Sequence, residues 1–190
     1  MVKLFSIFFL FSTLLLNCAE KKVLMIIAFE NFRDEEFIIP RRIIEKNGFT
    51  VKVASWEKGI AKGMLGTKVK VDMKLDEVNV DEFEGVIFVG GIGATKYFND
   101  KTAHRIAKEF YKKKKVIGAI CFGPVILANA GILKGKRATC FYTKGKVLVS
   151  KGAKYTGKEV EVDGLIITGN GPKAAEKFGY GFLKLLKSSK

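Results

Sequence analysis

The stretch Val-Ile-Gly-Ala-Ile-Cys-Phe-Gly-Pro, residues 116–124, decides how this chain folds. Residues 116–120 form a short apolar run, and the residues after the Gly-Pro pair have the apolar spacing of a helix. The pattern predicts a strand, a sharp turn that carries Cys121, and a helix. Ala119 and Gly123, on either side of the cysteine, are small enough to let the backbones cross closely.

A cysteine at such a turn has two interpretations. The positive end of the helix dipole favours a thiolate, so a reactive Cys121 is expected to have a pKa below that of a free thiol. The alternative is that Cys121 is a small, buried apolar residue, as most free cysteines are. The local sequence leaves both interpretations open.

Apolar runs alternate with amphipathic segments over the rest of the chain. Its 190 residues, 48% of them hydrophobic, are enough for one domain with a proper core. The longer predicted strands and helices are, in turn, strands at 22–28, 49–54, 86–89, 116–120 and 165–168, and helices at 37–46, 102–113, 125–130 and 173–186. A hairpin or edge strands are expected at 59–71, and short strands near 137–140 and 160–162. This order predicts an α/β fold with a doubly wound, mostly parallel sheet sandwiched by helices.

Three of the predicted strand ends carry residues that could take part in a reaction. Glu36 follows the first strand, Gly90 and Gly91 follow the third, and Cys121 follows the fourth. Ligands of such folds bind outside the carboxyl ends of the strands, where these residues are expected to meet. The backbone N–H groups of Gly91 and Phe122 could then stabilise an oxyanion. The structural alternatives are a helix-dipole carboxylate for Glu36 and a tight turn for the glycines.

The first 17 residues have the layout of a signal peptide. Lys3 precedes an apolar run at 4–16 that is too short to span a bilayer, and Cys18 follows soon after. The pattern resembles a lipoprotein signal, so we expect cleavage before Cys18, its lipidation, and a domain over 18–190 anchored to the membrane of the cell envelope or periplasm. Asn17 departs from the usual small residue at its position. A soluble periplasmic or secreted product, or an uncleaved anchor, therefore stays open.

The charge balance is strongly basic, with 34 Lys and Arg against 19 Asp and Glu and a net charge of +15. The lysines are scattered along the chain and do not alternate with aromatic residues. A solvated basic surface is therefore favoured over a nucleic-acid partner.

Several separate motifs together resemble the ThiJ/PfpI family, also called the DJ-one family, of the class I glutamine amidotransferase-like superfamily. They are Val-Leu-Met-Ile-Ile-Ala (23–28), Glu-Glu-Phe-Ile-Ile-Pro (35–40), Val-Ile-Phe-Val-Gly-Gly (86–91) and Gly-Ala-Ile-Cys-Phe-Gly-Pro (118–124). Their order and spacing cover nearly the whole domain. The resemblance implies a flavodoxin-like fold and a homodimer.

The resemblance also implies roles for single residues. Cys121 matches the family's reactive cysteine at the nucleophile elbow. Glu36 matches a carboxyl group that is usually protonated and donates a hydrogen bond to the thiolate, and Gly91 matches the glycine whose N–H group faces the oxyanion.

The chain lacks the histidines that some members of the family have near the cysteine. Protease-type members have a histidine directly after the cysteine, where this chain has Phe122. Members proposed to act on glyoxal or glycated proteins often have a histidine after the next strand, where this chain has Cys140, a candidate for a secondary role. The single histidine, His104, lies in a predicted helix body, so we expect it to pack or be partly exposed and to take no part in catalysis.

Two classes of function remain. In the first, the protein is a glyoxalase III or deglycase-like enzyme whose Cys121 thiolate, assisted by Glu36, attacks small reactive aldehydes or glycated substrates. No metal or organic cofactor is expected, because the sequence holds no ligand cluster. In the second, Cys121 oxidation serves a redox-sensing or chaperone-like stress protein, with Cys140 as a resolving partner. A PfpI-type protease is less favoured because Phe122 replaces the triad histidine.

Overall fold

The computed structural model describes residues 20–189 of the chain. The predicted signal peptide over residues 1–17 and the predicted lipidation site Cys18 lie outside these residues. Within the described part of the chain, no helix is long and apolar enough to cross a membrane.

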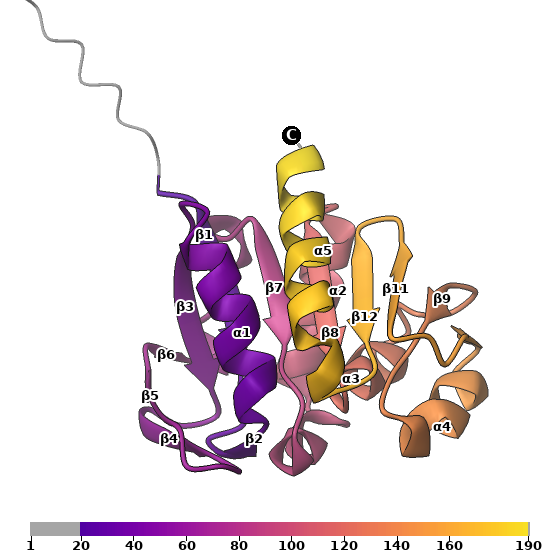
Figure 1. The fold of residues 1–190 in the computed structure, drawn as a ribbon, viewed down its shortest axis with the longest axis horizontal. Helices are drawn as coiled ribbons and strands as arrows, with labels where there is room; N and C mark the ends of the chain where they lie inside the picture. The colour runs from indigo at the N-terminus through magenta and orange to yellow at the C-terminus, as the bar shows by residue number, and fades with distance from the viewer. Residues whose placement is uncertain (1–19, 190) are drawn as a thin grey trace, which may run out of the picture.

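A seven-stranded sheet forms the centre of the molecule (Figure 1). Its strand order is β11-β12-β8-β7-β1-β3-β6, and every neighbouring pair is parallel except β11 with β12. In chain order the strands are β1 (Lys22–Ile26), β3 (Thr50–Ser55), β6 (Met73–Lys74), β7 (Gly85–Phe88), β8 (Val116–Ile120), β11 (Val160–Asp163) and β12 (Ile166–Gly169). Every residue of β7 and β8 is buried, which explains why both strands read as continuous apolar runs.

Helices cover both faces of this sheet and form two separate cores with it. On one face lie α1 (Asp34–Glu45) and α5 (Ala175–Ser188), which pack against each other, as Figure 1 shows. On the other face lie α2 (Lys101–Lys112) and α3 (Gly123–Asn129). The prediction of a doubly wound, mostly parallel sheet between helices is confirmed.

Smaller elements surround the central sheet. They are the three-stranded sheet of β2 (Glu30–Phe32), β4 (Gly59–Gly63) and β5 (Lys68–Val71), the pair β9 (Arg137–Ala138) and β10 (Lys154–Tyr155), the helix α4 (Gly145–Ser150), and the 3₁₀ turns η1 (Leu75–Glu77), η2 (Val80–Glu82), η3 (Ile92–Tyr97), η4 (Tyr142–Lys144) and η5 (Pro172–Ala174). The hairpin expected at 59–71 is the antiparallel pair β4 and β5. β2, β10 and α4 were not predicted, because such short elements carry almost no periodic signal.

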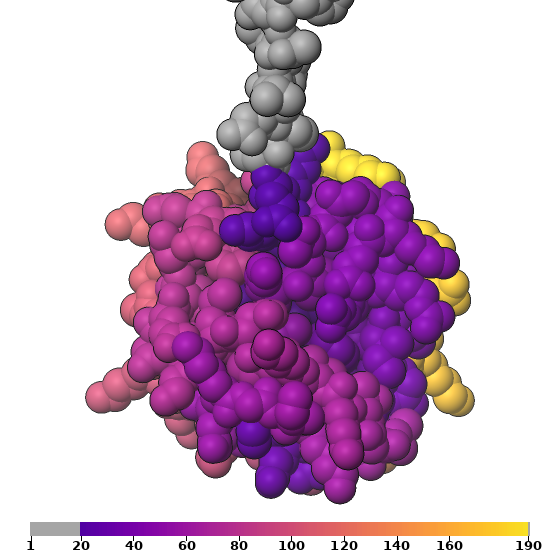
Figure 2. Space-filling view, turned by 90° about the vertical axis from the view of Figure 1, so that its left-hand side faces the viewer, coloured from indigo at the N-terminus to yellow at the C-terminus, as the bar shows by residue number. Residues whose placement is uncertain are grey.

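The first half of the described chain builds one whole side of the molecule, which Figure 2 shows in indigo to magenta. Within this side, Asp34, the first residue of α1, connects the helix to the turn between β4 and β5. Its buried carboxylate accepts hydrogen bonds from the N–H groups of Leu65 and Thr67, each at 2.8 Å. Although burial opposes ionisation, these hydrogen bonds keep the pKa of Asp34 below its ordinary value. The start of α1, which also carries Glu36, is thereby fixed to the β4–β5 turn.

Replacing Asp34 by alanine is expected to lower the free energy of unfolding by roughly 1.5–3 kcal/mol, because the N–H groups of Leu65 and Thr67 lose a buried, charged acceptor. Asp34→Asn should have a smaller effect, since an amide oxygen can still accept one of the two hydrogen bonds. Urea unfolding at pH 7 measures both. Equal stability of Asp34→Ala and the wild type would contradict this account of the contact.

Candidate active site

Cys121 lies at the sharp turn between β8 and α3. Its backbone has φ = 61°, in the left-handed region that residues other than glycine rarely adopt. Hydrogen bonds from neighbouring loops hold this turn on both sides: the Cys121 N–H donates to the Gly169 carbonyl, and the Phe141 N–H donates to the Cys121 carbonyl, each at 2.9 Å. A conformation that is unfavourable in isolation is therefore fixed by the fold.

Glu36 lies in the first turn of α1 and is fully buried. Its Oε2 atom accepts a hydrogen bond from the Gly90 N–H at 3.1 Å, while its Oε1 atom has no hydrogen-bond partner. A Cβ atom at Gly90 would lie 2.5 Å from Glu36 Oε2 and 2.6 Å from Cys121 Cβ, so only glycine fits between the two side chains. The structure thus brings Glu36, Gly90 and Cys121 together at the carboxyl ends of their strands.

Burial raises the pKa of Glu36 to about 8. Hydrogen bonding with Cys121, the positive charge of Arg33 and the Gly90 N–H all act in the opposite direction and do not offset the loss of water. The carboxyl group is therefore mostly protonated at neutral pH and can donate as well as accept a proton.

The pKa of Cys121 is also raised, first by burial and then by the negative charge of an ionised Glu36. The side chain is only 6% exposed, so the expectation of a lowered thiol pKa, which rested on the helix N-terminus and Glu36, is wrong for this structure. Hydrogen bonds from the N–H groups of Gly91 and Phe122 favour the thiolate. Because the repulsion disappears when Glu36 holds a proton, the two groups titrate as a pair.

Arg33 is a neighbour of this site that sequence reasoning missed. Its guanidinium group binds Glu35 through two hydrogen bonds of 2.8 and 2.9 Å, and its charge acts on both Glu36 and Cys121. Its backbone N–H donates to the Gly90 carbonyl at 3.1 Å. An arginine directly before an acidic first turn was a visible signal, but only the fold shows that it lies beside the cysteine.

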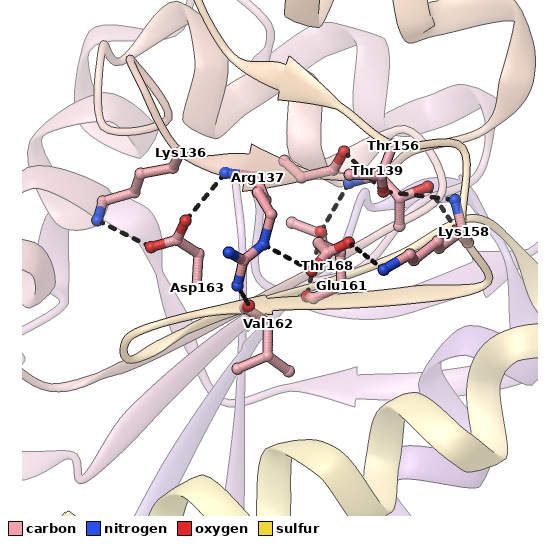
Figure 3. A network of polar contacts seen from close by, with 10 residues as sticks. Lys136, Arg137, Thr139, Thr156, Lys158, Glu161, Val162, Asp163 and Thr168 are labelled. Atoms are coloured by element: carbon pink, nitrogen blue, oxygen red, sulfur yellow. Dashed lines mark hydrogen bonds and ion pairs between the residues drawn. The ribbon is translucent and has the colours of Figure 1, made fainter.

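Cys140 lies in the loop after β9, which the polar network of Figure 3 fixes to β11 and β12. The Thr139 N–H donates to Thr168 Oγ1 at 2.9 Å, and the Thr139 hydroxyl donates to the Lys158 carbonyl at 2.6 Å. In the same network, buried Glu161 accepts a hydrogen bond from Arg137 at 3.2 Å. The network therefore positions the loop whose Phe141 N–H holds the cysteine turn.

The two buried cysteines are separate free thiols in this structure. Cys121 belongs to the core that contains α1 and α5, whereas Cys140 belongs to the core on the opposite face of the sheet. Burial raises the pKa of Cys140 to about 12, so its thiol is neutral at physiological pH. A role of Cys140 as a resolving thiol stays a prediction.

His104 lies in the first turns of α2, half-buried, and its Nε2 atom is 2.9 Å from the Phe98 carbonyl oxygen. The position after the cysteine belongs instead to Phe122, whose ring packs between those of Phe98 and Phe141 at centroid distances of 6.2 and 5.8 Å. Within residues 20–189, no three His, Cys, Asp or Glu side chains gather as a metal site would require.

The fold and these contacts define a class of protein: a flavodoxin-like α/β domain with a cysteine at a strand–helix turn beside a buried carboxyl group. The chain belongs to the DJ-1/PfpI family, whose profile matches residues 21–185. The resemblance stated from the sequence motifs is thereby confirmed.

Comparisons with individual proteins agree with this family. The chain is 36% identical to the deglycase PfpI of Pyrococcus furiosus, over 87% of this chain and 99% of the relative. It is 33% identical to the putative cysteine protease YraA of Bacillus subtilis, over 88% of this chain and 99% of the relative. The solved structure of a ThiJ/PfpI domain protein from Brachyspira murdochii superposes with a TM-score of 0.87 at 34% identity, covering 89% of this chain and 98% of that one.

The paired titration predicts how alkylation of Cys121 depends on pH. In the wild type the alkylation rate should rise with pH and have its midpoint at about pH 8, where Glu36 ionises and can accept the thiol proton. In Glu36→Gln nothing accepts that proton and burial still raises the thiol pKa, so the midpoint should move upward by at least ~1 unit, about tenfold in rate at fixed pH. Iodoacetamide labelling of the Cys121 peptide, followed by mass spectrometry, measures both.

Glu35→Gln is the matched control, because Glu35 is the adjacent acid and binds Arg33 away from the thiol. It should leave the midpoint unchanged or lower it, since it releases the Arg33 charge. An unchanged midpoint in Glu36→Gln would remove Glu36 from the site. A lower midpoint would show that Glu36 acts on the thiol only through its charge, and would overturn its role as the proton acceptor.

Proposed function

We propose that the protein is a cysteine-dependent enzyme acting on reactive aldehydes, with glyoxalase III or deglycase-like chemistry. The observation that supports this most is the juxtaposition of a buried thiol, a carboxyl group with a pKa near 8, and two N–H groups directed at the sulfur. This set supplies a nucleophile, a proton carrier and donors for a developing negative oxygen. The description of relatives as deglycases agrees with it.

In the first step, ionised Glu36 accepts the thiol proton as the Cys121 sulfur forms a bond to the aldehyde carbon of methylglyoxal. The carbonyl electron pair moves to the oxygen, which the N–H groups of Gly91 and Phe122 stabilise. Glu36 then returns the proton to this oxygen and completes a hemithioacetal. Because its pKa lies near neutral, Glu36 can perform both transfers.

In the second step, Glu36 removes the hydrogen on the former aldehyde carbon as a proton and delivers it to the neighbouring carbon, while the hydroxyl proton of the hemithioacetal passes to the ketone oxygen. The aldehyde carbon is oxidised to a thioester and the ketone carbon is reduced to an alcohol, so no external oxidant is needed. Water then hydrolyses the thioester and releases lactate and the Cys121 thiol. An adduct of methylglyoxal with an amine would reach the same hemithioacetal when the Cys121 sulfur forms the C–S bond as the C–N bond breaks, and the amine leaves with the proton that Glu36 took from the thiol.

A PfpI-type protease has less support, because Phe122 stands where a triad histidine would be and His104 is engaged with Phe98. The non-enzymatic alternative, redox sensing or chaperone-like function through Cys121 oxidation, uses the same thiol. It predicts oxidation of Cys121 by peroxide without turnover of any aldehyde.

Cys121→Ser is expected to abolish conversion of methylglyoxal to lactate, whereas His104→Ala should leave it nearly unchanged. The wild-type rate should be low, since a histidine shuttle of the kind that contributes ~10²–10⁴-fold is absent. Cys140→His, at the position of the family histidine, should raise the rate above that of the Cys140→Ser control. Lactate formation by the purified protein measures all four variants.

Turnover that survives Cys121→Ser would overturn the mechanism. Turnover that is absent from the wild type while Cys121 is readily oxidised would favour the redox alternative.

A homodimer, implied by the family, remains a prediction that light scattering of the purified protein can check.

We also propose that the mature protein begins at Cys18 and is anchored through lipid on this cysteine. The support is the charged start, the apolar run at 4–16 and the cysteine that follows it. Mass spectrometry of the protein from its native membranes should find an N-terminal peptide that starts at Cys18 and carries acyl chains. An N-terminus at Ala19 or later, or an intact Met1, would exclude lipidation.

A further inference from the structure

We propose that a subsite for an anionic group lies beside Cys121, formed around Lys144 and the adjoining cavity, and that the preferred substrates are aldehydes that carry a carboxylate. This inference rests on the proposed function, because it specifies the substrate class of the same cysteine. Three independent features of the structure support it: an ammonium group without a carboxylate partner, its attachment to the cysteine turn, and a cavity that contains no acid.

Lys144 is held over aromatic rings at the position directly after the cysteine. Its Nζ atom lies 4.8 Å from the centroid of the Phe122 ring and 6.0 Å from that of Phe98. The residue is half-buried, yet within residues 20–189 it forms no ion pair. Arg33, the other cation near the thiol, is bound by Glu35 through two hydrogen bonds. Lys144, unlike Arg33, therefore retains its charge for a ligand.

The backbone fixes Lys144 relative to the reactive sulfur. The Lys144 N–H donates to the Phe141 carbonyl at 2.8 Å, and the Phe141 N–H donates to the Cys121 carbonyl at 2.9 Å. The ammonium charge reaches this loop, because it lowers the pKa of Cys140 against the effect of burial. The cation is thus part of the loop that closes around the cysteine turn.

A cavity of about 260 Å³ adjoins the same loop. Its lining residues are aromatic, small or cationic, with no acid among them: Cys140, Phe141, Tyr142, Tyr155, Gly157, Asn170, Gly171, Pro172 and Lys173. Asn170 directly follows Gly169, whose carbonyl binds the Cys121 N–H, and Phe141 separates the cavity from Phe122. Lys144 and Cys121 do not line this cavity themselves, and its own donors are the Asn170 amide and the Lys173 ammonium group. Such donors in an otherwise apolar pocket suit a carboxylate with a short carbon chain.

The chemistry can be followed with glyoxylate, the carboxylate analogue of methylglyoxal. The Cys121 sulfur bonds to its aldehyde carbon, the carbonyl electron pair becomes an alkoxide, and Glu36 protonates that oxygen. The product is a hemithioacetal that forms reversibly and has no ketone carbon to receive a second proton. Glyoxylate should therefore occupy the site without turnover and report binding alone.

The local charge can be measured with two alkylating reagents that differ mainly in charge, iodoacetate and iodoacetamide. With the full chain at pH 7.5 and low salt, their rates at Cys121 are followed on its peptide by mass spectrometry. Lys144→Met should lower the iodoacetate-to-iodoacetamide rate ratio by ~5–10-fold, as expected for loss of a nearby positive charge. Lys144→Arg should preserve the ratio, and so should Lys146→Met, which removes an exposed lysine two residues further on.

Protection by glyoxylate provides the second measurement. Glyoxylate should protect Cys121 from iodoacetamide at lower concentration than acetaldehyde does, and Lys144→Met should remove this difference. A ratio that changes less than ~threefold in Lys144→Met, or equal protection by both aldehydes in the wild type, would overturn the anionic subsite. Failure of the proposed function looks different: Cys121 would be alkylated with the predicted charge preference, yet methylglyoxal would not be converted.

Discussion

The close approach of two chain segments at Gly90 is the constraint on which the rest of the site depends. A side chain there would collide with both Glu36 and Cys121, so the absence of one allows a carboxyl group and a thiol to share a water-excluded space. Burial then determines the electrostatics, because it raises the pKa of both groups and couples their protons. A carboxyl group that titrates near neutral pH follows from packing, without a histidine.

The turn at Cys121 shows how the fold maintains an unfavourable local conformation. Its positive φ is held by hydrogen bonds from the loop after β12 on one side and the loop after β9 on the other. The polar network around Thr139 and Glu161 fixes the second of these loops. Residues far from the reactive sulfur thus determine its geometry, which is why a scaffold of parallel strands with short loops suits this chemistry.

The replacement of a histidine by Phe122 changes the character of the site more than its geometry. An aromatic ring cannot carry a proton, but it can hold a cation over its face, and Lys144 occupies that position. Glu36 thus lies beside the cysteine, and the ring of the next residue carries a positive charge over its face.

The sequence alone determined the order of strands and helices and the residues at the strand ends, because hydrophobic periodicity and turn residues are local properties. It identified Glu36, Gly91, Phe122 and Cys121 as neighbours for the same reason: parallel strands end at one edge of the sheet. It could not give the direction of the pKa shift of Cys121, since burial depends on segments far apart in the chain.

Other features were also decided only by the tertiary structure. The position of Lys144 over an aromatic ring, the position of Arg33 beside Cys121 and the separate cores to which Cys140 and Cys121 belong all arise from contacts between distant residues. Short elements such as β2 and α4 also form only because longer elements pack beside them. Local patterns fix which residues reach the site, and long-range packing fixes their charge and exposure.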